Sequence, residues 1–331
     1  SGAILREEGD PEAEEADILT AQGEFLGRAT CHPGSEIRAR LYDVDPAARL
    51  DEEGLRMRLR AARDRRRAWL GTPEEPAGER LVFSESDGLP GLIVDRYGRA
   101  LVVQILTAFM DRRREILFRI LEEEWPSALL LERSEGDLLK YEGLQPRTVS
   151  WKGNAPDGLV FHENGLRFQA DWQMGHKTGF YLDQRTARAA VARWIAACGA
   201  KRVLDVCAYT GAFSVYARKA GAEEIVAIDS SAHAREGALR HWHGNNLGEG
   251  LTFRVENAFE TLRGLVRAGE RFDAIVLDPP KLAPNRSALT RALRAYKDLN
   301  LHACRLLKPG GLLFSFSCSG LVGRDLFLKV I

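Results

Sequence analysis

Two residues that could carry out chemistry follow apolar stretches in the C-terminal half of the sequence. Asp278 opens the run Asp278-Pro279-Pro280-Lys281 after "FDAIVL", and Cys318 follows "LLFSFS". A thiolate is a strong nucleophile, and a carboxylate beside it can accept a hydrogen bond or a proton. A small residue at a strand end can equally be a packing residue. The position of Cys318 in the fold therefore decides its role.

The elements that must position these residues alternate regularly from Leu182 onward. Apolar stretches typical of buried strands are separated by amphipathic helices that end near glycine, and the stretches cover 202–208, 224–229, 251–256, 272–278 and 312–318. Strict alternation of strand and helix predicts a doubly wound α/β fold with a parallel sheet. In such folds ligands bind beyond the carboxyl ends of the strands, so each strand end is a candidate site.

The first two strand ends fit a nucleotide-like cofactor. Asp205 lies at the first end, and the small-residue turn that follows, with Ala208, Tyr209 and Gly211, would let the backbone approach a ligand. The turn lacks the G-x-G-x-x-G pattern, which disfavours a dinucleotide. At the second end, Asp229 and Ser230 come about 20 residues later, where an acidic side chain binds ribose hydroxyls. A helix N-cap is the structural alternative there.

The third and fourth strand ends complete the candidate cofactor site. Asn257 and Ala258 follow the third strand, where Asn257 could bond the edge of an adenine ring or cap a helix. Asp278 follows the fourth strand, and the two prolines after it hold the backbone rigid beside the ligand. Taken together, the four ends resemble the class I S-adenosylmethionine-dependent methyltransferases from about residue 166 to the end of the chain.

Further stretches narrow this resemblance. The runs "ESDGLPGLIVDRYG" and "DWQMGHKTGFYLDQR", together with "DPPK" and "SCS", are similar to the large-subunit ribosomal RNA cytosine-5 methyltransferases. The resemblance implies that the segment from Asp171 to Arg185 closes over the cofactor. It therefore implies candidate cofactor contacts at Lys177, Thr178, Phe180 and Arg185, with Arg185 suited to the methionine carboxylate of the cofactor. An interdomain clamp without cofactor contact is the alternative.

The resemblance also implies three domains. Residues 1–45 are rich in short strand and turn signals and would form a PUA-like β-barrel. Residues 46–165 would form an arginine-rich linker helix, a boundary loop at Gly71–Glu79 and a small α+β central domain, and 166–331 the Rossmann-like methyltransferase domain. Because family members extend beyond "SGAIL" and beyond Ile331, we expect a chain truncated at both ends.

Methylation at C5 of cytosine is the activity that the resemblance implies. C5 is a poor nucleophile until a thiolate adds to C6, so the reaction needs a cysteine, and Cys318 is the candidate, with Asp278 bonding the base edge. The target base must be unpaired or flipped out. Cys207, in the cofactor turn, is the main alternative nucleophile. Cys198 and Cys304 fall on helices and are expected in the core.

Other functions stay open at this point. A uracil-5 enzyme would use the same thiol chemistry, and a non-catalytic RNA-binding or assembly factor could keep the same fold. An N-directed methyltransferase is a further alternative, but Leu282 stands where such an enzyme would carry an aromatic residue to stack the base. The cytosine-5 family also usually has an aromatic residue at this position.

Composition sets the remaining bounds. The chain has 331 residues, 28% of them charged, with a formal net charge of zero, which argues against a strongly basic scaffold. Five widely spaced cysteines without a C-x-x-C pair give no disulfide or zinc pattern. No apolar run reaches the length of a membrane span. We expect a cytoplasmic protein without a metal, with S-adenosylmethionine as cofactor and ribosomal RNA as partner; oligomeric state stays open, a homodimer included.

Overall fold

The computed structural model of the chain describes residues 4, 6–35, 37–71 and 76–331. The chain divides into two compact units, Ser1–Asp183 and Gln184–Ile331. This division lies in the segment that we expected to close over the cofactor, and the three domains expected from the sequence stay a prediction. The expected opening "SGAIL" and the boundary loop at Gly71–Glu79 lie partly outside the described residues.

The first unit begins with a small antiparallel sheet. It consists of β1 (Glu15–Leu19), β2 (Phe25–Cys31) and β3 (Ala39–Asp43), in that order. Glycine and proline interrupt the sequence between these strands, as the short strand signals predicted. Within the described residues, the sheet is consistent with the strand-rich N-terminal piece expected for a PUA-like domain.

The arginine-rich helix α1 (Glu52–Leu70) follows, and Asp51 caps its N-terminus by accepting from the amide of Gly54. Its arginines form ion pairs with carboxylates of the same unit: Arg56, Arg60 and Arg63 pair with Glu124, Arg58 with Asp43, and Arg66 with Asp87. Arg60 donates a hydrogen bond that lowers the pKa of Glu124. These pairs support a structural role for this arginine run within the first unit.

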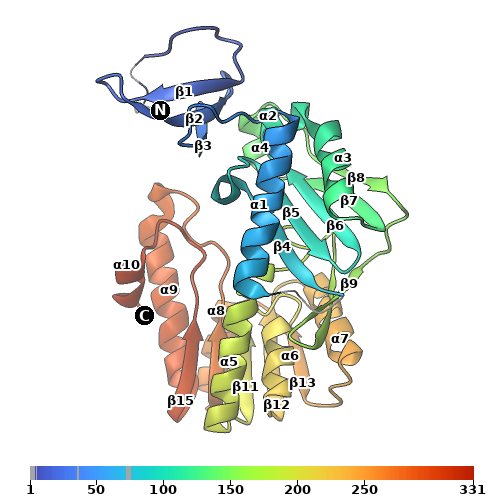
Figure 1. Ribbon diagram of the computed structural model, residues 1–331. Coiled ribbons are helices and arrows are strands. Elements are labelled where there is room, and N and C mark those ends of the chain that lie inside the picture. The colour runs from blue at the N-terminus through green and yellow to red at the C-terminus, as the bar shows by residue number, and fades with distance from the viewer. Residues whose placement is uncertain (1–3, 5, 36, 72–75) are drawn as a thin grey trace. The chain divides into compact units, whose positions relative to one another are not determined.

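The central sheet of the first unit has five strands in the order β4-β5-β6-β7-β8, and only β6 and β7 pair in parallel. Helices α1 and α3 cover one face and bury an apolar core with it (Figure 1). The bounds are β4 (Gly78–Phe83), β5 (Leu92–Tyr97), β6 (Ala100–Ile105), α2 (Ala108–Arg112), α3 (Arg114–Glu124), β7 (Leu129–Ser134), α4 (Leu138–Tyr141) and β8 (Arg147–Lys152).

Two features of this sheet differ from the sequence prediction. The single helix expected from "DRRREILFRILEEEW" is two helices that meet at Arg113. Strand β8 gave no signal in the sequence, because all six of its residues are exposed and it lacks a buried face that would produce an alternating pattern.

A hairpin of β9 (Leu159–Glu163) and β10 (Leu166–Ala170) completes the regular structure of the first unit. Its turn is the Asn164-Gly165 pair that predicted it. Phe161 and Phe168 of the hairpin pack with Tyr97 and Phe180, with ring centroids 5.0–5.9 Å apart. The domain boundary expected between residues 165 and 166 falls within this hairpin, whereas the structure includes both of its strands in the first unit.

The second unit is the predicted α/β fold. Its five strands are all parallel, in the order β13-β12-β11-β14-β15, and the chain order reverses between β11 and β14. The strands are β11 (Arg202–Val206), β12 (Glu224–Asp229), β13 (Leu251–Val255), β14 (Phe272–Leu277) and β15 (Leu307–Ser315). Every carboxyl end therefore lies at one edge of this sheet, and the switch point lies between the strands that carry Asp205 and Asp278.

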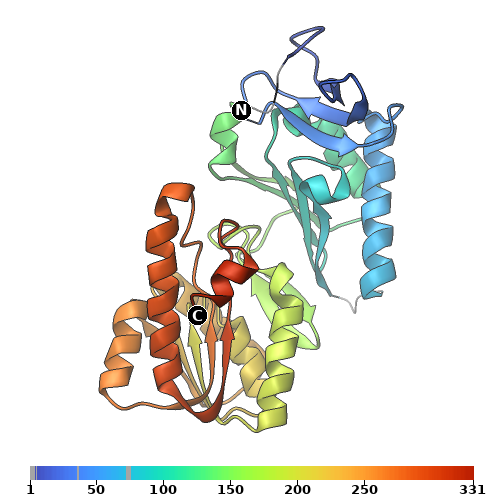
Figure 2. The ribbon, with the colours of Figure 1, turned by 90° about the vertical axis from the view of Figure 1, so that its left-hand side faces the viewer.

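Helices cover both faces of this sheet (Figure 2). Helices α5, α6 and α7 contact one another on one face, and α8 and α9 pack together on the other, where Leu262, Leu299 and Leu306 meet the strands. The helices are α5 (Arg185–Cys198), α6 (Ala212–Lys219), α7 (Ala232–Gly244), α8 (Ala258–Arg267), α9 (Leu289–Leu306) and α10 (Arg324–Leu328). Among the described helices, none is long and apolar enough to cross a membrane.

The ion pair between Arg66 and Asp87 gives a test of the packing of α1. Arg66 donates two hydrogen bonds, of 3.0 and 2.7 Å, to the buried carboxylate of Asp87, which also accepts from the amide of Phe83. Asp87→Asn leaves a half-buried guanidinium without a counterion, and we expect the free energy of unfolding to fall by about 2–3 kcal/mol.

Urea denaturation measures this change. The control is Asp64→Asn, which removes an exposed pair with Arg63 and should cost less than about 0.5 kcal/mol. Equal losses in the two variants would contradict a structural role for the buried pair.

Candidate active site at the carboxyl edge of the sheet

The turn between β11 and α6 has an unusual backbone. Cys207, Tyr209 and Gly211 have φ angles of 60°, 48° and 66°. The left-handed region costs a residue with a side chain about 1–2 kcal/mol. At Gly211 a Cβ atom would lie 3.0 Å from that of Ala238, so glycine fits there for space as well as for φ. The amide of Ala208 donates to Ile228, which holds this turn against β12. The turn predicted after the first strand is therefore present.

Asp205 lies in β11 and is almost completely buried. Its Oδ2 accepts from the amide and the hydroxyl of Ser214, at 3.1 and 2.6 Å, which joins the strand to the first turns of α6. Its Oδ1 has no hydrogen-bond partner within the described residues. Burial, followed by the nearby charges of Asp278 and Asp229, raises the pKa of Asp205 to about 7.

Asp229 ends β12 and binds the same turn. Its Oδ2 accepts from the amide of Tyr209 at 2.8 Å, and its Oδ1 accepts from the amide of Ser231 at 3.0 Å. Ser231, rather than Asp229 or Ser230, is the N-cap of α7, and Ser230 is exposed. Each carboxylate oxygen has two lone pairs, so Asp229 can still accept hydroxyl groups of a ligand.

Asn257 forms a helix N-cap, which the sequence analysis gave as the alternative to a contact with adenine. It is the N-cap of α8, and its side-chain oxygen accepts from the amides of Phe259 and Glu260 at 2.9 and 3.3 Å. Ala258 is the first residue of that helix and is half-buried. The cap fixes the side-chain oxygen of Asn257, so a contact with a base edge would come from its amide nitrogen.

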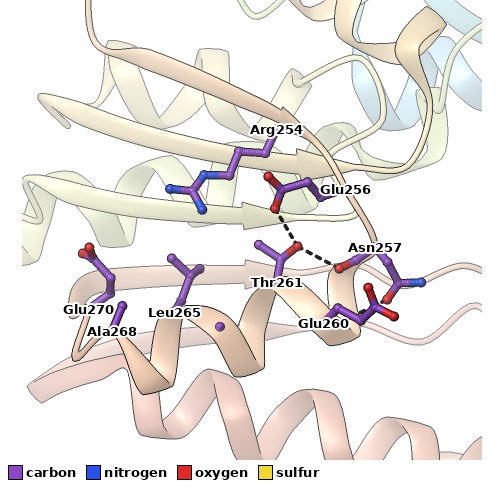
Figure 3. A pocket seen from close by; sticks show the side chains of 9 residues that line it. Arg254, Glu256, Asn257, Glu260, Thr261, Leu265, Ala268 and Glu270 are labelled. Atoms are coloured by element: carbon purple, nitrogen blue, oxygen red, sulfur yellow. Dashed lines mark hydrogen bonds between the residues drawn. The ribbon is translucent and has the colours of Figure 1, made fainter.

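A groove of about 510 Å³ begins at Asn257 and runs along α8 to Ala268 and Glu270 (Figure 3). Within it, Thr261 donates a hydrogen bond of 2.8 Å to Glu256 (Figure 3). Because the groove follows the helix away from the carboxyl edge of the sheet, only its Asn257 end belongs to the candidate site.

Asp278 directly follows β14 at the centre of the edge. Its amide donates to Val206 of the neighbouring strand, and its Oδ2 accepts from Nε2 of Gln184 at 2.6 Å. The sequence analysis did not select Gln184, although the residue lies in the "LDQR" run. Gln184 is the first residue of the second unit, and its side chain orients the carboxylate of Asp278.

Cys207 lies among the three carboxylates. Burial is the main cause that raises the pKa of its thiol to about 12, and the charges of Asp229, Asp278 and Asp205 add to it. A thiol in such a field stays protonated at neutral pH and is a poor nucleophile. This environment disfavours Cys207 as the alternative nucleophile.

Cys318 lies three residues beyond the end of β15, because this strand ends at Ser315 rather than at the cysteine. Strand β15 pairs with β14, with Ser315 opposite Leu277. The Cys318 residue is exposed, and its Sγ lies 3.8 Å from the carbonyl oxygen of Pro279. The thiol therefore faces the Asp278-Pro279-Pro280 backbone rather than the core.

Two smaller sequence predictions need correction. Cys198 and Cys304, expected in the core, are exposed on α5 and α9. Leu282, for which the sequence analysis expected no stacking, is half-buried and packs against two apolar clusters.

The candidate contacts that the resemblance implied divide between the units. Thr178 is fully buried in the first unit, where its hydroxyl bonds Asp95 at 2.5 Å and Tyr97 at 2.8 Å. The neighbouring Gly179 has a φ of 124°, and a Cβ there would lie 2.8 Å from the backbone of Asp171. The segment is therefore fastened to the first unit.

The other three candidates differ in their surroundings. Phe180 is buried in the aromatic cluster of the hairpin, and Lys177 pairs with Asp183 at 2.8 Å. Arg185 begins α5 in the second unit and is half-buried. Side chains at 177, 178 and 180 thus have partners in the first unit. The interdomain clamp stays a prediction, and so does contact with a cofactor for all four residues.

The chain can now be compared with known proteins. A family model described as S-adenosylmethionine-dependent methyltransferase matches residues 102–331. "Ribosomal RNA large subunit methyltransferase I" of Escherichia coli O127:H6 is 40% identical over 334 residues, covering 100% of this chain and 83% of that protein. The protein of the same name from Shewanella amazonensis is 41% identical over 320 residues, with 96% and 80% covered.

A solved structure, SMU.776 complexed with SAH, has a TM-score of 0.83 at 21% identity and covers 100% of this chain and 83% of that one. This likeness confirms the fold. The chain belongs to the S-adenosylmethionine-dependent methyltransferases, within the family of ribosomal RNA large subunit methyltransferase I. Its cofactor is S-adenosylmethionine, as the strand ends predicted.

The thiol environments predict different reactivities. With a pKa of about 12, Cys207 has on the order of one thiolate in 10⁴ molecules at pH 8. Iodoacetamide should therefore modify Cys318 in the folded protein while Cys207 stays unmodified, as peptide mass spectrometry would measure. Cys304, an exposed thiol of the same unit, is the reference. Modification of Cys207 at the rate of Cys304 would contradict the assignment.

Asp205 predicts a pH dependence of stability without cofactor. Its pKa of about 7 lies above the usual value of about 3.9, so the folded state binds a proton that the unfolded state releases. The resulting stabilisation is complete below about pH 4 and is lost as the pH rises to about 7. At about 1.4 kcal/mol per pKa unit, the loss amounts to a few kcal/mol.

Asp205→Asn removes this titration. The free energy of unfolding of the wild type minus that of the variant should therefore fall between pH 4 and 7 and level off above pH 7, as urea denaturation at several pH values would measure. A difference that does not vary with pH would show that Asp205 has an ordinary pKa.

Proposed function

We propose that this chain forms 5-methylcytosine in large-subunit ribosomal RNA, through a covalent adduct between Cys318 and C6 of the base. The observation that carries the proposal is the position of Cys318, whose exposed thiol lies 3.8 Å from Pro279, beside Asp278 and beyond two neighbouring parallel strands. The relatives named for ribosomal RNA large subunit methylation support the RNA substrate.

The residues of the edge fit the cofactor. The turn before α6 has three residues in the left-handed region, among them Gly211 without a side chain. The buried Oδ1 of Asp205 has no partner within the described residues, so a polar ligand group could satisfy it. Asp229 would accept the ribose hydroxyls, Ala208, Tyr209 and Gly211 would border the ligand, and Asn257 would approach the adenine. S-adenosylmethionine supplies an electrophilic methyl group when it is bound.

The protein's own residues would carry the remaining steps. The Cys318 thiolate adds to C6 of the cytosine, which moves electron density to C5. C5 takes the methyl group, a base removes the C5 proton, and elimination of the thiolate restores Cys318 and the aromatic ring. Asp278, oriented by Gln184, would accept a hydrogen bond from the base's amino group and hold the ring in line.

Two cysteine variants test the scheme. We expect wild-type protein with S-adenosylmethionine and undermodified large-subunit RNA to yield 5-methylcytosine, and Cys318→Ala to lower the rate by about 10³-fold or more, as for other nucleophile deletions. Cys304→Ala, which removes another exposed thiol of the same unit, should retain full activity. Nucleoside mass spectrometry identifies the product.

A trapping experiment tests the covalent step. RNA that contains 5-fluorocytosine cannot lose a proton from C5, so elimination is blocked and the adduct with Cys318 should accumulate as a shifted band. Methylation that survives in Cys318→Ala would show that Cys318 is not the nucleophile. 5-methyluracil as the product would show that the target base is uracil rather than cytosine.

A further inference from the structure

Two serines beside Cys318 share one hydroxyl partner. The hydroxyl of Ser317 donates to the hydroxyl oxygen of Tyr296 at 2.9 Å, and Tyr296 bonds the hydroxyl of Ser319 at 3.0 Å. The amide of Ser319 closes the ring by donating to the hydroxyl of Ser317 at 3.3 Å. Cys318 lies between the two serines, so both of its neighbours are fastened to the same point.

Tyr296 is a rigid anchor. It belongs to α9, is completely buried and packs in a cluster with Ala283, Ala292 and Val322, while its ring meets that of Phe327 edge-on at 5.4 Å. Because its oxygen accepts from Ser317, its proton can be donated to Ser319. Hydrogen bonds aligned in this way strengthen one another in a buried site.

The same network reaches the loop that follows β14. The hydroxyl of Ser319, itself buried, accepts from the amide of Ala283 at 3.2 Å, and Sγ of Cys318 lies against Pro279 of that loop. The hydroxyl of Ser319 thus joins the loop that carries Asp278 to the loop that carries Cys318, and the Tyr296 hydroxyl anchors Ser319 and Ser317 to α9. The regular strand ends at Ser315 and its ladder at the amide of Phe316, which donates to Leu277, so these side-chain bonds are what fix Ser317 and Ser319 on either side of Cys318.

We propose that Tyr296 is a positioning residue for Cys318, which it holds beside Asp278 through Ser317 and Ser319. This inference rests on the proposed function, because it assigns Tyr296 to the step in which the thiol adds to the base. Small displacements of a reacting atom cost about 10²-fold in rate, so an anchor for an exposed thiol on an irregular loop has a large effect.

Tyr296→Phe tests the role, since it keeps the ring in its cluster and removes only the hydroxyl. We expect adduct formation with saturating 5-fluorocytosine RNA, and kcat for methylation, to fall by about 10- to 100-fold. The Kd of S-adenosylmethionine and the KM for RNA should stay unchanged. A merely structural role would lower the thermal midpoint of unfolding without lowering kcat and the trapping rate selectively against an unchanged Kd and KM.

Tyr42→Phe is the matched control. Tyr42 is also a buried tyrosine whose hydroxyl takes part in a network: it donates to the carboxylate of Glu15, lies 3.1 Å from the carbonyl oxygen of Ala48 and accepts from Arg28, all in the first unit. It should have the trapping rate of the wild type. The double variant Ser317→Ala/Ser319→Ala should show the same loss of trapping rate as Tyr296→Phe. Adding Tyr296→Phe to the double variant should not lower the rate further, because all three changes remove the same hydrogen-bond network.

Amide hydrogen exchange separates the two proposals. In Tyr296→Phe, the amides of residues 316–322 should exchange faster than in the wild type, and they should do so in a Cys318→Ala background as well. Faster exchange with an unchanged trapping rate would overturn the positioning role, and so would unchanged exchange. Methylation that survives in Cys318→Ala would overturn the proposed function and, with it, the role of Tyr296 in the thiol step, while the exchange result in that background would still show whether Tyr296 anchors residues 316–322.

Discussion

The parallel pairing of β14 with both β11 and β15 is the constraint on which the candidate site depends. Leu277 lies opposite Val206 on one side and opposite Ser315 on the other. This register brings the residue after β14 beside the cofactor turn and also beside the loop with Cys318. A shift in the β14–β15 ladder would separate Asp278 from the thiol of Cys318, and a shift in the β11–β14 ladder would separate it from the turn before α6.

Around this register the protein uses buried polar contacts rather than apolar packing to fix the loops. Ser214 holds Asp205, Gln184 holds Asp278, and Tyr296 holds the serines beside Cys318. The contact of Ser214 joins consecutive elements, whereas those of Gln184 and Tyr296 join residues 94 and 21 positions apart. The shape of the edge therefore depends on the packing of the second unit, which places these donors and acceptors.

The sequence predicted this second unit well, because buried parallel strands and amphipathic helices each leave a strong periodic signal. Exposed β8 left no such signal, and the sequence could not show that the fifth strand stops before Cys318. The contacts of Gln184 and Tyr296 depend on tertiary packing, so residue type and spacing alone could not identify them. The serines of "SCS" are visible in the sequence, but their shared partner Tyr296 is not.

The left-handed backbone at Cys207 and Tyr209 has a consequence for protein engineering. Glycine at either position would relieve strain of about 1 kcal/mol, so a redesign directed only at thermostability would replace both residues. Such a redesign would remove the side chains of Cys207 and Tyr209 from the turn before α6. The hydrogen bond from residue 209 to Asp229 would stay, because it uses the backbone amide.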